Sequence, residues 1–122
     1  MRKMKAAGCN GIKVGIETGS ERVLQLINKR TTLSQAREAA KLFRKVRIHW
    51  TGYFMMGLPS ETKENVYATL RFMKELKPDY ASFSVYEPFP GTELFETGIK
   101  KGWFKTKELW KIFTPFLRNI TM

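Results

Sequence analysis

The chain has 122 residues, enough for one domain with a modest hydrophobic core. Hydrophobic residues make up 43% of it and charged residues 27%, as is typical of a soluble globular protein. No apolar run approaches the roughly 20 residues of a membrane-spanning helix, and the basic residues 1–5 lead into glycine and cysteine where a secretion signal has an apolar segment. We therefore expect a cytoplasmic protein without membrane contact.

The chain is strongly basic. Lysine and arginine number 22 against 11 acidic residues, which gives a formal net charge of +11. Such an excess favours contact with RNA or another polyanion. A solvated surface is an equally weighted interpretation, because the basic residues fall mostly within expected helices and at their ends. No arginine-rich run or known nucleic-acid module decides between the two.

Metal-ligating residues are scarce. There is one cysteine, Cys9, and one histidine, His49. A lone cysteine forms no internal disulfide, and iron–sulfur clusters and structural zinc sites each take several ligands. We expect no metal site within the chain, and His49 to be a polar residue at a strand edge.

Residues 1–7 have the character of the last turns of a helix that ends at Gly8. A chain that opens on the end of an element is expected to continue a longer fold. Residues 12–17 alternate in polarity and predict a first strand. Ser20 is suited to cap a helix over residues 21–28. Glu17, at the carboxyl end of the strand, is a candidate for binding hydroxyls or an amine; the alternative is that it pairs with a neighbouring lysine.

The next helix and strand follow in the same order. Thr32 and Gln35 match a capping box for a helix that runs to about residue 45. Residues 50–56 are apolar and aromatic and predict a buried strand. Gly57 and Pro59 turn the chain, and Thr62 starts a helix to residue 76. Gly57 lets a backbone approach a ligand closely, although a simple turn explains this segment taken alone.

Residues 80–86 alternate Ala81, Phe83 and Val85 with serines and predict a third strand, after a break at residues 77–79. A loop with two prolines and a glycine follows, and Thr92 caps a helix over residues 93–100. The aromatic residues of the tail, 103–122, are expected to pack along a helix. We thus divide the chain into residues 1–102 and an aromatic-rich helical tail, 103–122.

Three strands, each followed by helix, predict an α/β fold with a parallel sheet. Three such units are half of a small barrel or one open sheet. Ligands of these folds sit beyond the carboxyl ends of the strands. A parallel sheet is normally covered on both faces, so the bare strand at residues 12–17 predicts a missing partner or self-association.

Three segments, in this order and spacing, carry a resemblance: GIETGS at residues 15–20, GYFMMGLPSET at 52–62 and PFPGTEL at 88–94. Together they resemble the C-terminal half of a radical S-adenosylmethionine (radical SAM) core domain. The branch they most resemble contains cobalamin-binding radical SAM enzymes and tRNA methylthiotransferases. The resemblance covers residues 1–102 and implies half of a partial (β/α)6 TIM-like barrel, namely its fourth, fifth and sixth strands.

The resemblance also implies site residues at the ends of these strands. It places Glu17, Thr18 and Ser20 near the ribose and methionyl part of SAM. It places Met56, Gly57 and Pro59 against the adenine. Glu61 takes the place of the acidic residue that ends the family's motif, on the same side. It makes Tyr86 and Pro88 close the adenine side or face the substrate.

The departures from the family matter as much. The three-cysteine cluster motif and the glycine-rich stretch that binds the SAM amino group are both missing, and Cys9 corresponds to no cluster ligand. Reductive cleavage of SAM needs a [4Fe–4S] cluster held by three thiolates. The resemblance therefore implies a fragment, truncated product or separate subunit that is inactive alone and supplies the adenosyl side of the SAM site and part of the substrate cavity. A cobalamin domain would lie outside this chain.

Two alternatives stay open. The chain is a basic α/β module that binds nucleic acid without catalysis, or a half-barrel that self-associates through its strand edges. The first interpretation instead requires the missing N-terminal half of the barrel as its partner.

Overall fold

The computed structural model describes residues 1–87 and 89–102. Its contacts divide the chain into two compact units, Met1–Tyr86 and Glu87–Met122. The first unit contains, in order, α1 (Arg2–Ala6), β1 (Gly11–Glu17), α2 (Glu21–Leu26), α3 (Leu33–Val46), β2 (His49–Met56), α4 (Lys63–Leu76) and β3 (Tyr80–Val85). The second contains α5 (Glu93–Lys100). Among these described helices, none has the length and hydropathy needed to cross a bilayer.

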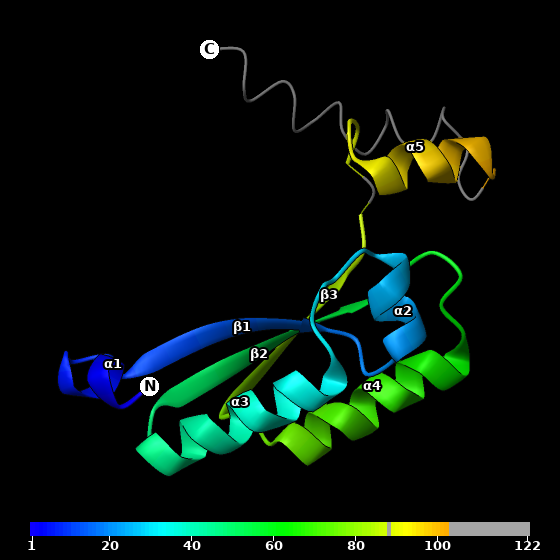
Figure 1. The fold of residues 1–122 in the computed structure, drawn as a ribbon. Coiled ribbons are helices and arrows are strands. Elements are labelled where there is room, and N and C mark those ends of the chain that lie inside the picture. The colour runs from blue at the N-terminus through cyan, green and yellow to red at the C-terminus, as the bar shows by residue number, and fades with distance from the viewer. Residues whose placement is uncertain (88, 103–122) are drawn as a thin grey trace. The chain divides into compact units, whose positions relative to one another are not determined.

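The three strands form one parallel sheet in the order β1-β2-β3, as Figure 1 shows. Val14 of β1 is paired with Gly52 of β2, and Gly52 with Ala81 of β3. Helices connect each strand to the next along the chain. The predicted α/β fold with three parallel strands is confirmed.

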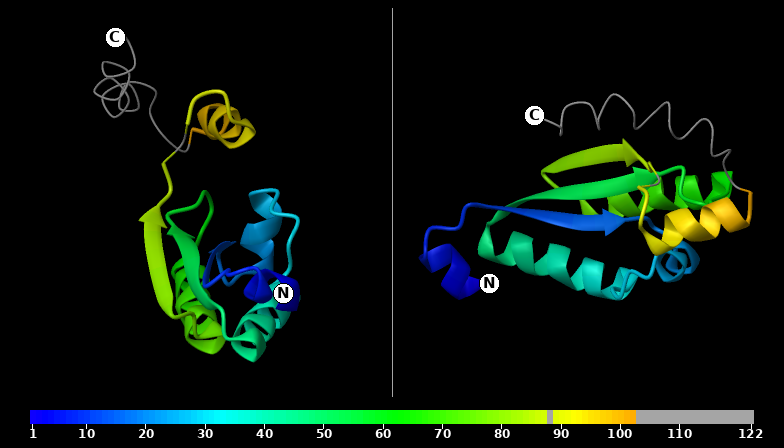
Figure 2. Two further views of the ribbon diagram at one scale, coloured as in Figure 1. Left: turned by 90° about the vertical axis from the view of Figure 1, so that its left-hand side faces the viewer. Right: turned by 90° about the horizontal axis from the view of Figure 1, so that it is seen from above.

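Helices α3 and α4 lie on the same face of the sheet (Figure 2). The core forms between them and the strands, from residues at helical spacing on the helices and alternate residues of β1 and β2: Ile16, Ala40, Phe43, Trp50, Phe54, Phe72 and Leu76. Phe54 is completely buried, whereas its neighbour Tyr53 is 38% exposed. Within Met1–Tyr86, one face of the sheet is thus covered by α3 and α4, and Tyr53 lies on the other face.

The ends of α3 show how local sequence sets an element. The backbone N–H of Gln35 donates to the Thr32 hydroxyl at 3.2 Å, and the Gln35 side chain accepts the N–H of Thr32 at 2.9 Å, so the predicted capping box is present. At the other end Arg47, with φ 53°, takes the left-handed position that glycine usually fills. Arg44 donates to the carbonyl oxygen of Leu76 at 2.7 Å and joins α3 to the end of α4.

Both edges of the sheet lack a neighbouring strand in the part of the chain that is described. On β3, Val85 is 74% exposed and Phe83 38% exposed, although the Phe83 ring stacks on Phe54 with centroids 5.1 Å apart. The alternation that predicts this strand is therefore present without the burial that usually accompanies it. Edge strands expose unpaired backbone groups, which favour pairing with a further strand.

The second unit begins with the loop before α5. Thr92 caps this helix as predicted: it accepts the N–H of Phe95 at 3.2 Å and donates to the carbonyl of Phe89 at 2.8 Å. Pro88 and the predicted helical tail, residues 103–122, lie outside the described residues. Our assignment of residues 1–102 to one half-barrel stays a prediction.

Candidate functional site

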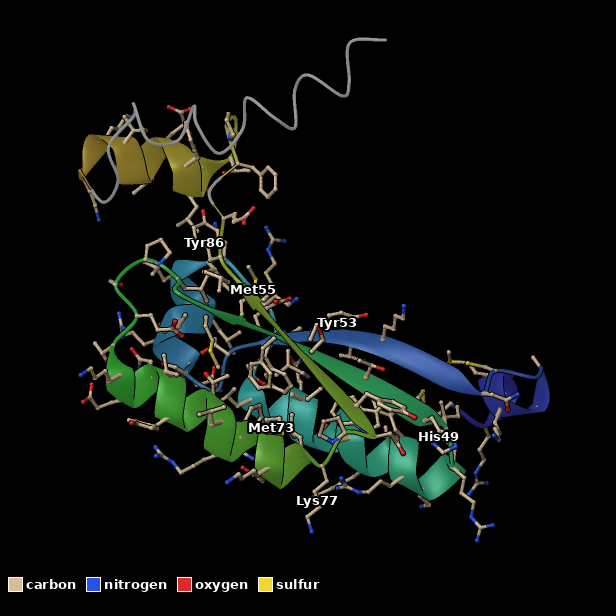
Figure 3. The ribbon with its side chains drawn as sticks, turned by 180° about the vertical axis from the view of Figure 1, so that it is seen from behind. His49, Tyr53, Met55, Met73, Lys77 and Tyr86 are labelled. Atoms are coloured by element: carbon tan, nitrogen blue, oxygen red, sulfur yellow. The ribbon has the colours of Figure 1, made fainter. Side chains whose placement is uncertain are left out.

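The three strands end at one edge of the sheet, which we call the carboxyl rim. The backbone N–H of Tyr86 donates to the carbonyl of Met56 at 2.7 Å, which joins the ends of β3 and β2. Glu17, at the end of β1, is paired with Phe54 of β2. Figure 3 shows Tyr86 near this rim and His49 toward the opposite end. Parallel α/β sheets bind ligands at this end of their strands.

Glu17 stands at the β1 end of the rim as half of an ion pair. Its carboxylate Oε1 accepts from Lys29 Nζ at 2.8 Å, and the two side chains are 18% and 32% exposed. The pair lies against Gly15, where a Cβ would overlap the Glu17 carboxylate and come within 3.2 Å of Lys29 Nζ. The alternative that Glu17 pairs with a lysine is therefore what the structure shows. The pair holds a carboxylate in place at the rim, and φ 68° at Glu17 bends the chain there.

Thr18 and Ser20 use their hydroxyls within the fold. Thr18 is completely buried, and its Oγ1 lies 3.0 Å from the hydroxyl of Thr69 on α4. Ser20 caps α2 by accepting the N–H of Val23 at 3.4 Å, and it also accepts from the side chain of Asn65 at 3.2 Å. Both residues fix the shape of the turn after β1, and Thr18 has no exposed surface.

The turn after β2 is shaped by Glu61. One carboxylate oxygen, Oε2, accepts the backbone N–H of Gly57 at 2.7 Å and that of Leu58 at 3.3 Å. The other, Oε1, is buried without a hydrogen-bond partner among the described residues. Gly57 has φ 75°, and Met56 and Pro59 beside it are half-buried. Glycine is suited to this conformation because it lacks a Cβ.

Beside this turn lies a hollow of about 420 Å³. Its lining comes from the turn and from the start of α4: Gly57, Glu61, Thr62, Lys63, Val66 and Tyr67. The exposed ring of Tyr67 forms part of it. A second hollow, of about 450 Å³, runs between the free edge of β1 and α3 and is lined in part by Val14, Ile16 and Leu42.

The sequence does not predict a role for one further residue at the rim. Arg22 of α2 donates to the side chain and backbone carbonyl of Ser60, and to the side chain of Asn65. These partners are 38 and 43 residues away along the chain. The only local signal is an arginine in the first turn of a helix, which resembles any solvated basic residue.

Tyr86 completes the rim at the end of β3. It is half-buried, and burial raises the pKa of its phenol above the ordinary value. The phenol therefore stays protonated at neutral pH and is able both to donate and to accept a hydrogen bond. Pro88, predicted beside it, lies outside the described residues.

No group of three or more histidine, cysteine or acidic residues able to hold a metal occurs within residues 1–87 and 89–102. Cys9 precedes β1, at the end of the sheet opposite the carboxyl rim, and its thiol donates to the carbonyl of Gly11 at 3.6 Å.

Comparison of the sequence with known proteins identifies the family of this chain. A profile described as the radical SAM superfamily matches residues 1–73. The chain is 40% identical to an uncharacterized methyltransferase of Pyrococcus horikoshii, over 93% of the chain and 24% of the relative. It is 32% identical to the tRNA-2-methylthio-N(6)-dimethylallyladenosine synthase of Acinetobacter baylyi, over 66% of the chain and 17% of the relative.

Among solved structures, the chain is similar to coproporphyrinogen III oxidase (HemN) of Escherichia coli, described as a radical SAM enzyme. The TM-score is 0.68 at 21% identity, over 95% of this chain and 28% of that one. The chain thus spans between 17% and 28% of the length of these proteins. The predicted partial-barrel fold and the predicted resemblance are confirmed. With more than half of its residues matched by the profile, the chain belongs to the radical SAM superfamily.

Proposed function

We propose that the chain supplies the adenosyl side of the SAM site of a radical SAM enzyme, together with part of its substrate cavity. One observation carries the proposal. In a chain of this superfamily, the ends of all three strands, marked by Glu17, Gly57 and Tyr86, lie at one rim of a single sheet.

The turn after β1 is proposed to bind the ribose. Glu17 presents a carboxylate that Lys29 holds at 2.8 Å. A carboxylate accepts two hydroxyl hydrogen bonds readily, and those bonds are stronger than neutral ones. Thr18 and Ser20 set the path of this turn through their contacts with α4.

The turn after β2 is proposed to bind the adenine. Gly57 has no Cβ to block the approach of a flat ring, although its N–H already donates to Glu61, and Met56 and Pro59 offer apolar surface. Glu61 holds two N–H groups of this turn and so keeps its shape. Tyr86, with its protonated phenol, closes the same side. SAM therefore fits the groups that this rim presents.

The [4Fe–4S] cluster of the family does not fit the residues present. It needs three thiolates, whereas the sequence has one cysteine, at the opposite end of the sheet from the rim. We assign the chain no electron-transfer step, and propose that it makes no radical by itself. Cluster ligands, and a cobalamin where the parent enzyme uses one, would come from other polypeptide segments.

The free edge of β1 is the proposed place for those segments. The hollow beside it presents apolar side chains at the edge of a parallel sheet, and Leu42 is 47% exposed there. A parallel strand with its own helix would cover both the unpaired backbone and this apolar surface. We propose the N-terminal half of the barrel as the partner, and self-association of two copies as the competing occupant.

A titration with 5′-deoxyadenosine tests the adenosyl site without requiring the cluster. Amide chemical shifts of the ¹⁵N-labelled chain are followed, with guanosine as the matched ligand control. We expect saturable amide shifts at Glu17, Gly57 and Tyr86. In the Glu17→Gln variant, the shift at position 17 should be lost. Shifts confined to residues away from the carboxyl rim, or equal shifts with guanosine, would contradict the proposal.

A further inference from the structure

The guanidinium of Arg22 reaches from α2 to the turn after β2. Nη2 donates to the carbonyl oxygen of Ser60 at 2.7 Å and to Asn65 Oδ1 at 2.6 Å, and Nη1 donates to Ser60 Oγ at 3.2 Å. Three hydrogen bonds from one side chain to two residues form a fork that lysine, with a single point charge, does not reproduce.

Ser60 is the residue of this turn that most needs support. Its φ is 57°, in the left-handed region that residues other than glycine adopt at a cost of roughly 1–2 kcal/mol. It immediately precedes Glu61, whose carboxylate holds the N–H groups of Gly57 and Leu58. The conformation of Ser60 therefore determines where the Glu61 side chain starts, and with it the shape of the proposed adenine turn.

Asn65 extends the contact to the other turn. Its Oδ1 accepts the backbone N–H of Thr62 at 3.1 Å as well as the Arg22 guanidinium, and its Nδ2 donates to Ser20 Oγ at 3.2 Å. Ser20 ends the turn that begins at Glu17. One network, in part half-buried, thus joins the proposed ribose turn to the proposed adenine turn.

We propose that Arg22 is a positioning residue for the nucleoside: it fixes the turn at residues 57–61 in its binding shape and couples this turn to the turn at residues 17–20. The inference rests on the proposed adenosyl site. It goes further by assigning the geometry of that site to a residue that belongs to neither turn and does not itself touch the ligand.

The test compares Arg22→Met with Arg71→Met, which removes the same charge from an exposed position on α4. Loss of Arg22 should speed amide exchange at Gly57 and Leu58 and raise the Kd for 5′-deoxyadenosine by about tenfold, the equivalent of roughly 1.4 kcal/mol. Arg71→Met should match the wild type in both. Arg22→Lys should recover part of the charge interaction but not the fork, and so fall between the two.

The thermal midpoint separates positioning from simple stabilisation. Arg22→Met that lowers the midpoint but keeps the wild-type Kd and the wild-type exchange at Gly57 would overturn the inference. So would an Arg22→Met chain that matches Arg71→Met throughout. Absence of any rim shift when 5′-deoxyadenosine is added to the wild-type chain is a different result, because it would overturn the proposed function itself.

Discussion

The hydroxyls of Thr18 and Thr69 lie 3.0 Å apart in the interior, and both side chains are completely buried. Thr69 also accepts the backbone N–H of Gly19 at 2.9 Å and donates to the carbonyl of Asn65 at 3.0 Å. This pair joins the turn after β1 to the middle of α4. The rim is thus held from inside by two threonines and from outside by Arg22.

Replacing Thr69 by valine should destabilise the fold by about 1–3 kcal/mol, because it leaves the half-buried N–H of Gly19 without its acceptor. Thr18→Val should cost less, since Thr18 shares fewer partners. The double variant should cost less than the sum of the two. Urea unfolding measures all three, with exposed Thr31→Val as the control; strictly additive losses would contradict the coupling.

The backbone of Gly19 packs so closely against α4 that no residue with a Cβ fits there without a shift. A Cβ at this position would lie 2.6 Å from the carbonyl oxygen of Ala68 and 2.8 Å from Cβ of Phe72. Neither atom moves without shifting the helix. Gly19→Ala should therefore destabilise the chain by about 1–3 kcal/mol. Gly11→Ala is the matched control, because its Cβ meets nothing nearer than 3.9 Å; equal midpoints for the two variants would show that α4 yields freely.

Local patterns in the sequence were sufficient for most of the fold. The capping box of Thr32 and Gln35 and the alternation along β2 set their elements through neighbours within a few residues. The helix predicted over residues 21–28 ends earlier, at Leu26, because the chain turns at Asn28 with φ 58°. Boundaries of this kind depend on how the chain leaves the helix, which propensity does not encode.

The site was predictable as a set of turns but not as a network. Strand ends and glycines point to the rim, whereas the Thr18–Thr69 contact joins residues 51 apart and the Arg22–Ser60 contact joins residues 38 apart. Such partners meet only after the helices pack on the sheet. The binding roles of the rim residues stay predictions, as do the partner at the β1 edge and the arrangement of residues 103–122.

Acid should weaken the end of the sheet opposite the rim through Asp79. Its hydrogen bond with His49, followed by the backbone N–H of Trp50, holds the pKa of the Asp79 carboxyl below its ordinary value. A carboxyl with a lowered folded pKa stabilises the fold above its unfolded pKa of about 3.9. That stabilisation is lost as the pH falls through the folded pKa.

Urea unfolding at pH values from about 5 downward through this window checks the effect. The wild type should lose stability steadily as Asp79 protonates, and Asp79→Asn should show a shallower loss, since it has no proton to take up there. Glu38→Gln, at an exposed carboxylate on α3, should keep the wild-type slope. Parallel curves for wild type and Asp79→Asn would exclude Asp79 as a source of acid sensitivity.

Gly57 tests whether the turn after β2 only reverses the chain or also faces a ligand. Gly57→Ala forces φ 75° on a residue with a Cβ, although the space itself is adequate, with the nearest atom, Val85 Cγ1, at 3.5 Å. Gly8→Ala imposes the same strain at φ 89°, in open space at the opposite end of the sheet. Each should cost roughly 1–2 kcal/mol of stability. Only Gly57→Ala should also weaken binding of 5′-deoxyadenosine, because its new methyl group occupies the surface proposed for the adenine. Equal losses of stability with unchanged binding in both variants would leave Gly57 a simple turn residue.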